Sequence, residues 1–186
     1  MPSRKAPTTR ATPVRWRASG RPRPPSAGSF AINVTVRDVM SHSPITIGPD
    51  ATLFDALVLM RSHRISGLPV VDDVGDVVGV LSQRDLARFL KTEGGIPEVT
   101  GLLDLLMFGL SDERGVGLQA LRQILQESSV RDAMSTPPIF ITSDASLELA
   151  ADMMRANEIN RIPVRQSGRL VGIVTRNDLV RALVHP

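Results

Sequence analysis

The sequence contains no cysteine, which excludes a disulfide framework, a thiolate metal site and a cysteine nucleophile. Its three histidines are far apart, at positions 42, 63 and 185, and this scatter argues against a histidine metal centre. No apolar run reaches the length that spans a bilayer, although 42% of the residues are hydrophobic. We therefore expect a soluble protein with no resident metal and no membrane partner.

Acidic residues are missing from the first 36 positions, which hold seven of the 22 basic residues. The rest of the chain contains the other 15 basic residues and all 19 acidic ones, so the net charge of +3 is due to the first 36 positions. Residues 1–33 are rich in Pro, Arg, Ser and Thr, a composition that predicts a disordered basic tail. We expect a cytoplasmic protein that does not act mainly on nucleic acid. An organellar transit peptide and a weak RNA or DNA contact are the alternatives for the tail.

Two halves of the sequence repeat each other. The segment Gly79–Leu86 (GVLSQRDL) returns as Gly172–Leu179 (GIVTRNDL). Such a duplication predicts two structural units with the same fold. Further segments match at an offset of 94: Val36–Met40 with Val130–Met134, Ser43–Ile47 with Pro137–Ile141, Asp50–Leu53 with Asp144–Leu147, and Leu68–Val70 with Ile162–Val164.

The pattern of each copy predicts a short strand, a helix, a strand hairpin and a second helix. In the first copy, Ile45–Ile47 is the short extended run, and Thr52 with Asp55 forms a capping box that starts the helix. The β-branched runs within Val70–Leu81 predict a hairpin around the acidic turn 72–76, and Leu86 lies on the second helix. The second copy repeats this order with Ile139–Ile141, Leu147–Met154, Ile162–Val174 and Asn177–Leu183.

The order of elements, the Leu-Pro-Val and Ile-Pro-Val segments and the two Gly-x-x-Ser/Thr-x-x-Asp-Leu endings resemble a tandem pair of cystathionine-beta-synthase-type (CBS) domains. The resemblance covers residues 34–92 as the first domain and 128–184 as the second. It implies an α+β fold with a β-α-β-β-α unit in each copy. It also implies that the two sheets pack against each other about a pseudo-twofold axis, with two clefts between the copies.

The resemblance implies a regulatory sensor module and not an enzyme. Similar proteins usually bind AMP, ADP, ATP or S-adenosylmethionine as a regulatory ligand, with no catalytic cofactor, and modulate a partner protein. Similar pairs usually dimerise, so we expect a homodimer. A ligand-independent scaffold for protein interactions and a nucleic-acid contact through the basic tail are the alternative functions.

Ser82 with Asp85, and Thr175 with Asp178, are candidate nucleotide contacts. A carboxylate three residues after a hydroxyl, at a strand-to-helix turn, can accept both hydroxyl protons of a ribose. The first amides of the helix can then face phosphate oxygens. The same spacing matches a capping box, which stabilises a helix start without any ligand. Both roles stay open at this point.

Three arginines are candidate phosphate contacts. Arg84 and Arg176 fall inside the repeated motif, and Arg161 precedes the Ile-Pro-Val segment. A guanidinium fork suits oxyanions, although each arginine could equally lie on a solvated surface. Because Arg84 aligns with Asn177, and Arg161 with Gly67, the two clefts need not bind the same ligand.

Two further segments, 43–46 and 137–140, resemble the stretch whose backbone meets the adenine edge in similar proteins. Ile45, Thr46 and Ile139 are therefore candidate contacts to the adenine ring. The ordinary alternative is that the two isoleucines are core residues of strands.

Residues 93–127 form a connector or insertion that is longer than the pair of domains needs. It contains the apolar group Leu102–Leu110 and a helix-like stretch at Leu118–Leu125. We predict a helical lid on the core of the pair, with a partner-binding face as the alternative.

Overall fold

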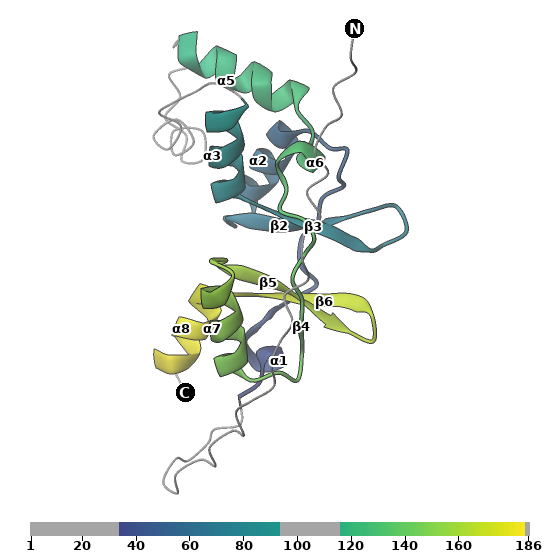
Figure 1. Ribbon diagram of the computed structural model, residues 1–186, viewed down its shortest axis with the longest axis vertical. Coiled ribbons are helices and arrows are strands. Elements are labelled where there is room, and N and C mark those ends of the chain that lie inside the picture. The colour runs from purple at the N-terminus through teal and green to yellow at the C-terminus, as the bar shows by residue number, and fades with distance from the viewer. Residues whose placement is uncertain (1–33, 94–115, 185–186) are drawn as a thin grey trace, which may run out of the picture. The chain divides into compact units, whose positions relative to one another are not determined.

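The computed structural model describes residues 34–93 and 116–184, in which the two copies of the repeat fold in the same way (Figure 1). The predicted tail and the apolar group Leu102–Leu110 lie outside the described residues. The first copy contains α1 (Val36–Val39), β1 (Ser41–His42), α2 (Leu53–Ser62), β2 (Gly67–Val71), β3 (Val77–Ser82) and α3 (Gln83–Thr92). Helix α5 (Val116–Glu127) lies between the two copies in the sequence, and the second copy contains α6 (Val130–Ala133), β4 (Ile141–Thr142), α7 (Leu147–Ala156), β5 (Arg161–Gln166), β6 (Arg169–Thr175) and α8 (Arg176–Val184).

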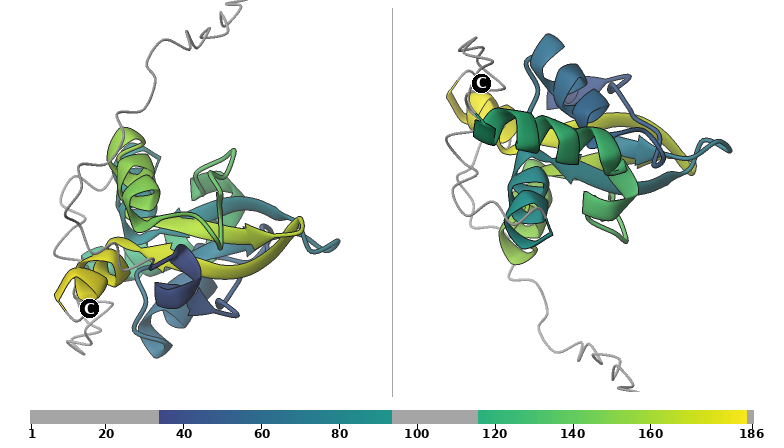
Figure 2. Two further views of the ribbon diagram at one scale, coloured as in Figure 1. Left: turned by 90° about the horizontal axis from the view of Figure 1, so that it is seen from below. Right: turned by 90° about the horizontal axis from the view of Figure 1, so that it is seen from above.

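An antiparallel hairpin forms the centre of each copy, β2 with β3 and β5 with β6, as predicted. In the first turn, Oδ1 of Asp72 accepts from the N–H groups of Val74 (3.2 Å) and Asp76 (2.9 Å). The second turn is Ser167-Gly168, where both residues have positive φ, as a tight two-residue turn requires. Figure 2 shows both turns at the same end of the described unit.

Each hairpin is widened by one parallel and one antiparallel neighbour. In the second copy β4 pairs parallel with β5, and β1 pairs antiparallel with β6, which gives the strand order β1-β6-β5-β4. The first hairpin has only single bridges at the same places, Ile47 with Val70 and Val80 with Ser135. The two sheets therefore follow one mixed plan, and the α+β class is confirmed.

The predicted short strand at Ile45–Ile47 was wrong in its extent. Only Ile47 pairs with the hairpin, while the strand forms earlier, at β1. Ser43 adopts φ 47 and Pro44 has no N–H, so the chain turns between β1 and Ile47 and cannot form a continuous ladder. The same holds for Ile139–Ile141, of which Ile141 alone belongs to β4.

The two copies exchange their first segments. The N–H groups of Val36 and Arg37 donate to the carbonyls of Ala145 and Ser143 in the second copy. In return, Val130 and Arg131 at the start of the second repeat donate to Ala51 and Pro49 in the first. Accordingly α1 contributes to the apolar core of the second copy and α6 to that of the first, which ties the two copies together.

The glycine that opens each repeated motif makes room for this exchange. A Cβ on Gly79 would come within 2.5 Å of Sδ of Met134, and a Cβ on Gly172 within 2.5 Å of Sδ of Met40. Each methionine follows one of the exchanged helices, α6 or α1. The motif glycine is thus needed for the approach of the other copy's chain.

Helix α5 completes the core of the first copy. Leu121 and Leu125 are fully buried in the same cluster as Leu57 of α2 and Leu90 of α3. The helix-like stretch predicted at Leu118–Leu125 is confirmed, and it packs as a lid on the protein's own core. None of the helices in the described ranges is both long and apolar enough to cross a membrane.

Candidate functional site

Two clefts lie between the copies, and each begins at one repeated motif. The Asp178 cleft has a volume of about 600 Å³ and includes Thr175, Arg176 and Asp178 with Ile45 of the other copy. The Asp85 cleft has a volume of about 850 Å³ and includes Ser82, Arg84 and Asp85 with Ile139 of the other copy. Both volumes lie in the range of small-molecule sites.

In the Asp178 cleft, Thr175 and Asp178 form the hydrogen bonds of a capping box. The backbone N–H (2.8 Å) and the hydroxyl (2.6 Å) of Thr175 both donate to Oδ2 of Asp178. Within the described part of the chain, Oδ1 of Asp178 accepts no side-chain or cap hydrogen bond. One carboxylate oxygen at the mouth of helix α8 is therefore available to a donor from a ligand.

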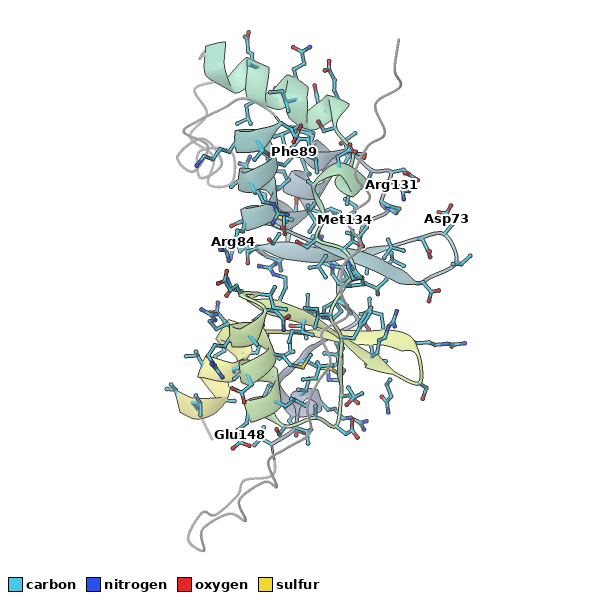
Figure 3. All side chains as sticks on the ribbon, viewed as in Figure 1. Asp73, Arg84, Phe89, Arg131, Met134 and Glu148 are labelled. Atoms are coloured by element: carbon cyan, nitrogen blue, oxygen red, sulfur yellow. The ribbon has the colours of Figure 1, made fainter. Side chains whose placement is uncertain are left out.

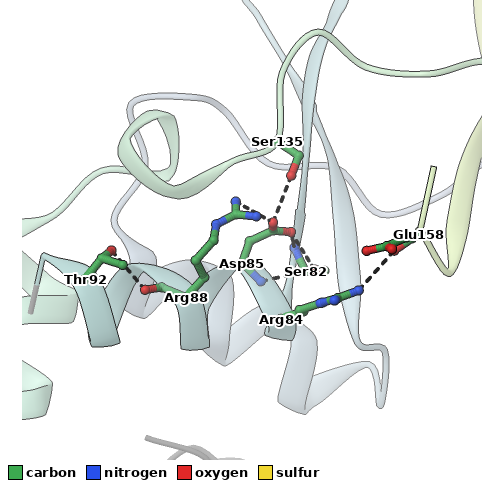
Figure 4. A network of polar contacts seen from close by, with 7 residues as sticks. All are labelled: Ser82, Arg84, Asp85, Arg88, Thr92, Ser135 and Glu158. Atoms are coloured by element: carbon green, nitrogen blue, oxygen red, sulfur yellow. Dashed lines mark hydrogen bonds and ion pairs between the residues drawn. The ribbon is translucent and has the colours of Figure 1, made fainter. Parts of the chain in front are cut away.

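Asp85 is engaged more completely (Figure 4). Oδ2 accepts from the N–H and the hydroxyl of Ser82, and Oδ1 accepts from Arg88 (2.8 Å) and from the hydroxyl of Ser135 (2.8 Å). Asp85 is only 6% exposed, and a buried carboxylate needs such donors. All four of its usual acceptor positions are filled by the protein itself.

The Asp178 cleft has the same residue types in a looser arrangement. Arg181 and Ser41 are the sequence equivalents of Arg88 and Ser135, and both line this cleft. In the described residues, the ion pair of Arg88 with Asp85 has no counterpart between Arg181 and Asp178. The two boxes thus differ in how many acceptors they leave open, although their sequences match.

Cationic side chains surround both clefts. The Asp178 cleft includes Arg64, Arg176 and Arg181, and the Asp85 cleft includes Arg88 and Lys91 besides Arg84. A phosphate or another anion would find several donors in either cleft.

Arg84 also connects the two copies. Its Nη1 donates to the backbone carbonyl of Glu158 (3.0 Å), which follows helix α7 in the second copy. Figure 3 shows Arg84 in the first turn of α3, on the side that faces the second copy. This hydrogen bond lies at the edge of the Asp85 cleft, so a ligand in that cleft would meet it.

Arg161 is the one candidate that lines both clefts. Its Nη2 donates to the hydroxyl of Ser66 (2.8 Å). Burial lowers the pKa of the Arg161 guanidinium, and the negative charge of Asp85 partly opposes this shift. The guanidinium stays charged, because the ordinary pKa of arginine lies far above neutral pH.

Two of the three candidate adenine contacts line a cleft, and the third does not. Ile45 and Ile139 each line one cleft, and Ile45 also packs against the first core, so both readings of this residue apply. Thr46 is exposed and is not part of the lining of either cleft. Thr46 therefore lacks the position that the resemblance implied for it.

The prediction from sequence missed several residues that shape the clefts. Arg88 and Arg181 stand three positions after the motif aspartates, so the motif extends to Ser/Thr-x-x-Asp-x-x-Arg in both copies. That repeat was a usable signal. Ser135 had no comparable signal, because it reaches Asp85 only through the exchange of segments.

The arrangement provides acceptors for hydroxyl groups, donors for anions and small apolar surfaces. In the described ranges, no three His, Asp or Glu side chains gather closely enough to hold a metal ion. The groups that are present fit the recognition of a polar, anionic ligand with a diol.

Comparison with known sequences agrees with the repeat. A sequence model of the CBS domain matches residues 36–92 and 130–185. The protein MJ1426 of Methanocaldococcus jannaschii is 34% identical over 156 residues, which cover 80% of this chain and 90% of that protein. The CBS domain-containing protein CBSX1 of Arabidopsis thaliana, named as chloroplastic, is 32% identical over 73% of this chain and 57% of its own length. Because this relative is named as chloroplastic, the cytoplasmic location expected for this chain stays a prediction.

Among solved structures, CBSX2 in complex with AMP superposes with a TM-score of 0.57 at 29% identity. The match covers 81% of this chain and 96% of the CBSX2 chain.

Proposed function

Because this chain belongs to the CBS domain family and carries two CBS domains in tandem, we propose that it is a regulatory sensor for an adenosine-containing ligand. The ligand would bind in the clefts between the two copies and modulate a partner protein. The observation that carries the proposal is the open Oδ1 of Asp178 beside several arginines at the mouth of one cleft. CBSX2, which was solved with AMP, supports the choice of an adenosine group.

Each part of an adenine nucleotide has a matching group in the Asp178 cleft. The ribose hydroxyls would donate to Asp178, in charge-assisted hydrogen bonds that are stronger than neutral ones. The phosphate would contact Arg176 and Arg161, both of which line the cleft. The apolar surface of Ile45 would lie against the adenine ring. Thr175 keeps its role as helix cap throughout, since its hydroxyl already bonds to the other carboxylate oxygen.

The Asp85 cleft is the weaker ribose site under this proposal. Its carboxylate would have to release Arg88 or Ser135 before it could accept from a ribose. Ser82, Arg84 and Ile139 still offer polar and apolar contacts to a second ligand.

A ligand signal would pass through contacts that join the copies. A ligand phosphate in the Asp85 cleft would compete with the Glu158 carbonyl for Arg84. Occupancy would thereby change how the two copies hold each other, and a partner protein that binds one arrangement better would respond.

The test is a thermal-unfolding screen with AMP, ADP, ATP, S-adenosylmethionine and GTP. A ligand that binds only the folded state adds about 2.7 kcal/mol at about 100 times its dissociation constant. For a protein of this size we expect a rise of about 5 to 10 °C in Tm with an adenosine ligand and none with GTP. No shift with any of the adenosine compounds would contradict the proposal and favour a ligand-independent scaffold.

A further inference from the structure

The wall between the two clefts is built from two equivalent pairs of residues. Ser66 and Gly67 of the first copy correspond to Asn160 and Arg161 of the second, at the offset of 94. Ser66, Asn160 and Arg161 line both clefts, and Gly67 lines the Asp178 cleft. The pseudo-symmetry is broken here, because an arginine on one side faces a glycine on the other.

Gly67 leaves the space that the guanidinium occupies. A Cβ on Gly67 would overlap Nη1 and Cζ of Arg161, and it would also come within 2.6 Å of the Leu81 carbonyl oxygen. A second arginine cannot therefore stand opposite the first. The wall has room for one cation, and that cation faces both clefts.

Arg161 carries a charge that the protein does not neutralise at short range. Within the described ranges, no carboxylate lies within ion-pair distance of its guanidinium, and its one side-chain hydrogen bond goes to the neutral hydroxyl of Ser66. A partly buried charge without an ion-pair partner is unfavourable, and an anionic ligand would relieve that penalty.

We propose that Arg161 is a phosphate-binding residue shared by both clefts, so that a phosphate-bearing ligand in one cleft lowers the affinity of the other cleft for a second. This inference rests on the proposed function. A bidentate contact uses one edge of the guanidinium, so a phosphate in one cleft leaves fewer and less well directed N–H donors of Arg161 for a phosphate in the other cleft. The coupling is reciprocal, because each ligand changes the other's affinity by the same factor. An uncharged nucleoside makes no phosphate contact with the guanidinium, so its binding in one cleft does not change the affinity of the other cleft.

The experiment uses backbone amide NMR of the full chain, titrated with AMP and, separately, with adenosine. The amides of Thr175–Asp178 report on one cleft and those of Ser82–Asp85 on the other. In the wild type, we expect the two AMP midpoints to be separated by about fivefold or more beyond the separation seen with adenosine. In Arg161→Gln, AMP should bind at least about tenfold more weakly at both reporters, and the extra separation should vanish.

The control is Arg169→Gln, which removes an exposed arginine of β6 outside both clefts and should match the wild type. Equal separations with AMP and adenosine would overturn the shared role of Arg161, as would unchanged AMP binding in Arg161→Gln. A wild type in which both compounds fill only one cleft would overturn it too, whereas adenosine in both clefts with AMP in one would support it. If neither compound shifts either reporter, the proposed function itself fails.

Discussion

At the scale of single residues, the protein uses one motif in two ways. Both carboxylate oxygens of Asp85 accept hydrogen bonds from Ser82, Arg88 and Ser135, whereas only one oxygen of Asp178 accepts hydrogen bonds, from Thr175. A carboxylate with a free oxygen can bind a ligand at once. A carboxylate whose acceptor positions are all occupied must first break hydrogen bonds within the protein, each worth about 1.5 to 3 kcal/mol when a charge is involved.

We predict that Asp178→Ala weakens AMP binding by roughly 1.5 to 3 kcal/mol, because the charge-assisted bonds to the ribose are lost. This corresponds to about a 10- to 150-fold higher Kd, measured by isothermal titration calorimetry. The comparison variant is Asp85→Ala, which should instead lower the free energy of unfolding by about 1 to 3 kcal/mol, because Ser82, Arg88 and Ser135 lose the acceptor that they share. A folded Asp178→Ala protein with the wild-type Kd would mean that the box only caps its helix.

At the scale of elements, the exchanged helices α1 and α6 hold the copies together, and both start with a capping box. At α6, the hydroxyl and the N–H of Ser129 donate to Asp132, and these bonds lower the pKa of the Asp132 carboxyl. A group whose pKa is lower in the folded state stabilises the fold above its unfolded pKa, near 4. That contribution disappears as the pH falls through the folded pKa.

Asp132→Ala should therefore destabilise the protein more at pH 7 than at pH 2, because the loss shrinks as the pH falls and the wild-type carboxyl takes up a proton. The loss at pH 7 should be no more than about 1 kcal/mol, because solvent screens this exposed group. Urea unfolding at the two pH values measures it. Asp73→Ala, at an exposed position of the first hairpin turn, serves as the control and should change neither value. An equal loss at both pH values would refute the electrostatic origin.

Helix α5 is an integral part of the first core, and a single truncation tests this. Leu125→Ala removes a fully buried side chain from the cluster that includes Leu90, and it should lower the free energy of unfolding by about 2 to 5 kcal/mol. Gln126→Ala, at an exposed position of the same helix, should stay within about 0.5 kcal/mol of the wild type. Denaturant titration measures both values. Equal stability of the two variants would mean that α5 is a detachable connector and not part of the core.

The sequence predicted the hairpins and the longer helices, but it predicted neither the short helices α1 and α6 nor the exchange of segments between the copies. The hairpins and the longer helices follow from local patterns, such as the spacing of Thr52 and Asp55, whose capping box formed as predicted. The exchange is invisible locally, because Val36 and Val130 lie in matching sequences and either segment could join either sheet. The same reason explains why Ser135 was missed beside Asp85.

At the scale of the whole molecule, the two copies differ in what covers their outer helices. Leu90 of α3 is fully buried in the cluster that α5 completes, whereas its equivalent Leu183 of α8 is 80% exposed. Val180 and Val184 of α8 and Leu149 of α7 are also exposed. An apolar helix face of this kind is suited to a second copy of the chain.

We predict a homodimer that buries this face. Light scattering at tens of micromolar should give twice the chain mass of 20.1 kDa. Leu183→Lys places a charge in the interface and should shift the species toward the monomer, while Val74→Lys, at an exposed hairpin turn, should not. A wild type that is monomeric at these concentrations would refute the dimer.

The two motifs and Arg161 could be chosen from the sequence as candidate site residues. The difference between the two motif carboxylates could not be predicted. The hydroxyl and carboxylate spacing is local, so the sequence contains it. Which carboxylate keeps a free oxygen depends on contacts such as those of Arg88, whose equivalent Arg181 is present in the other copy without the same ion pair.

The most direct test is a crystal structure of the protein grown with AMP. We predict that the ribose hydroxyls donate to the carboxylate of Asp178 and that the phosphate lies within hydrogen-bonding distance of Arg161. AMP bound on another surface, with the Asp178 cleft empty, would contradict the account.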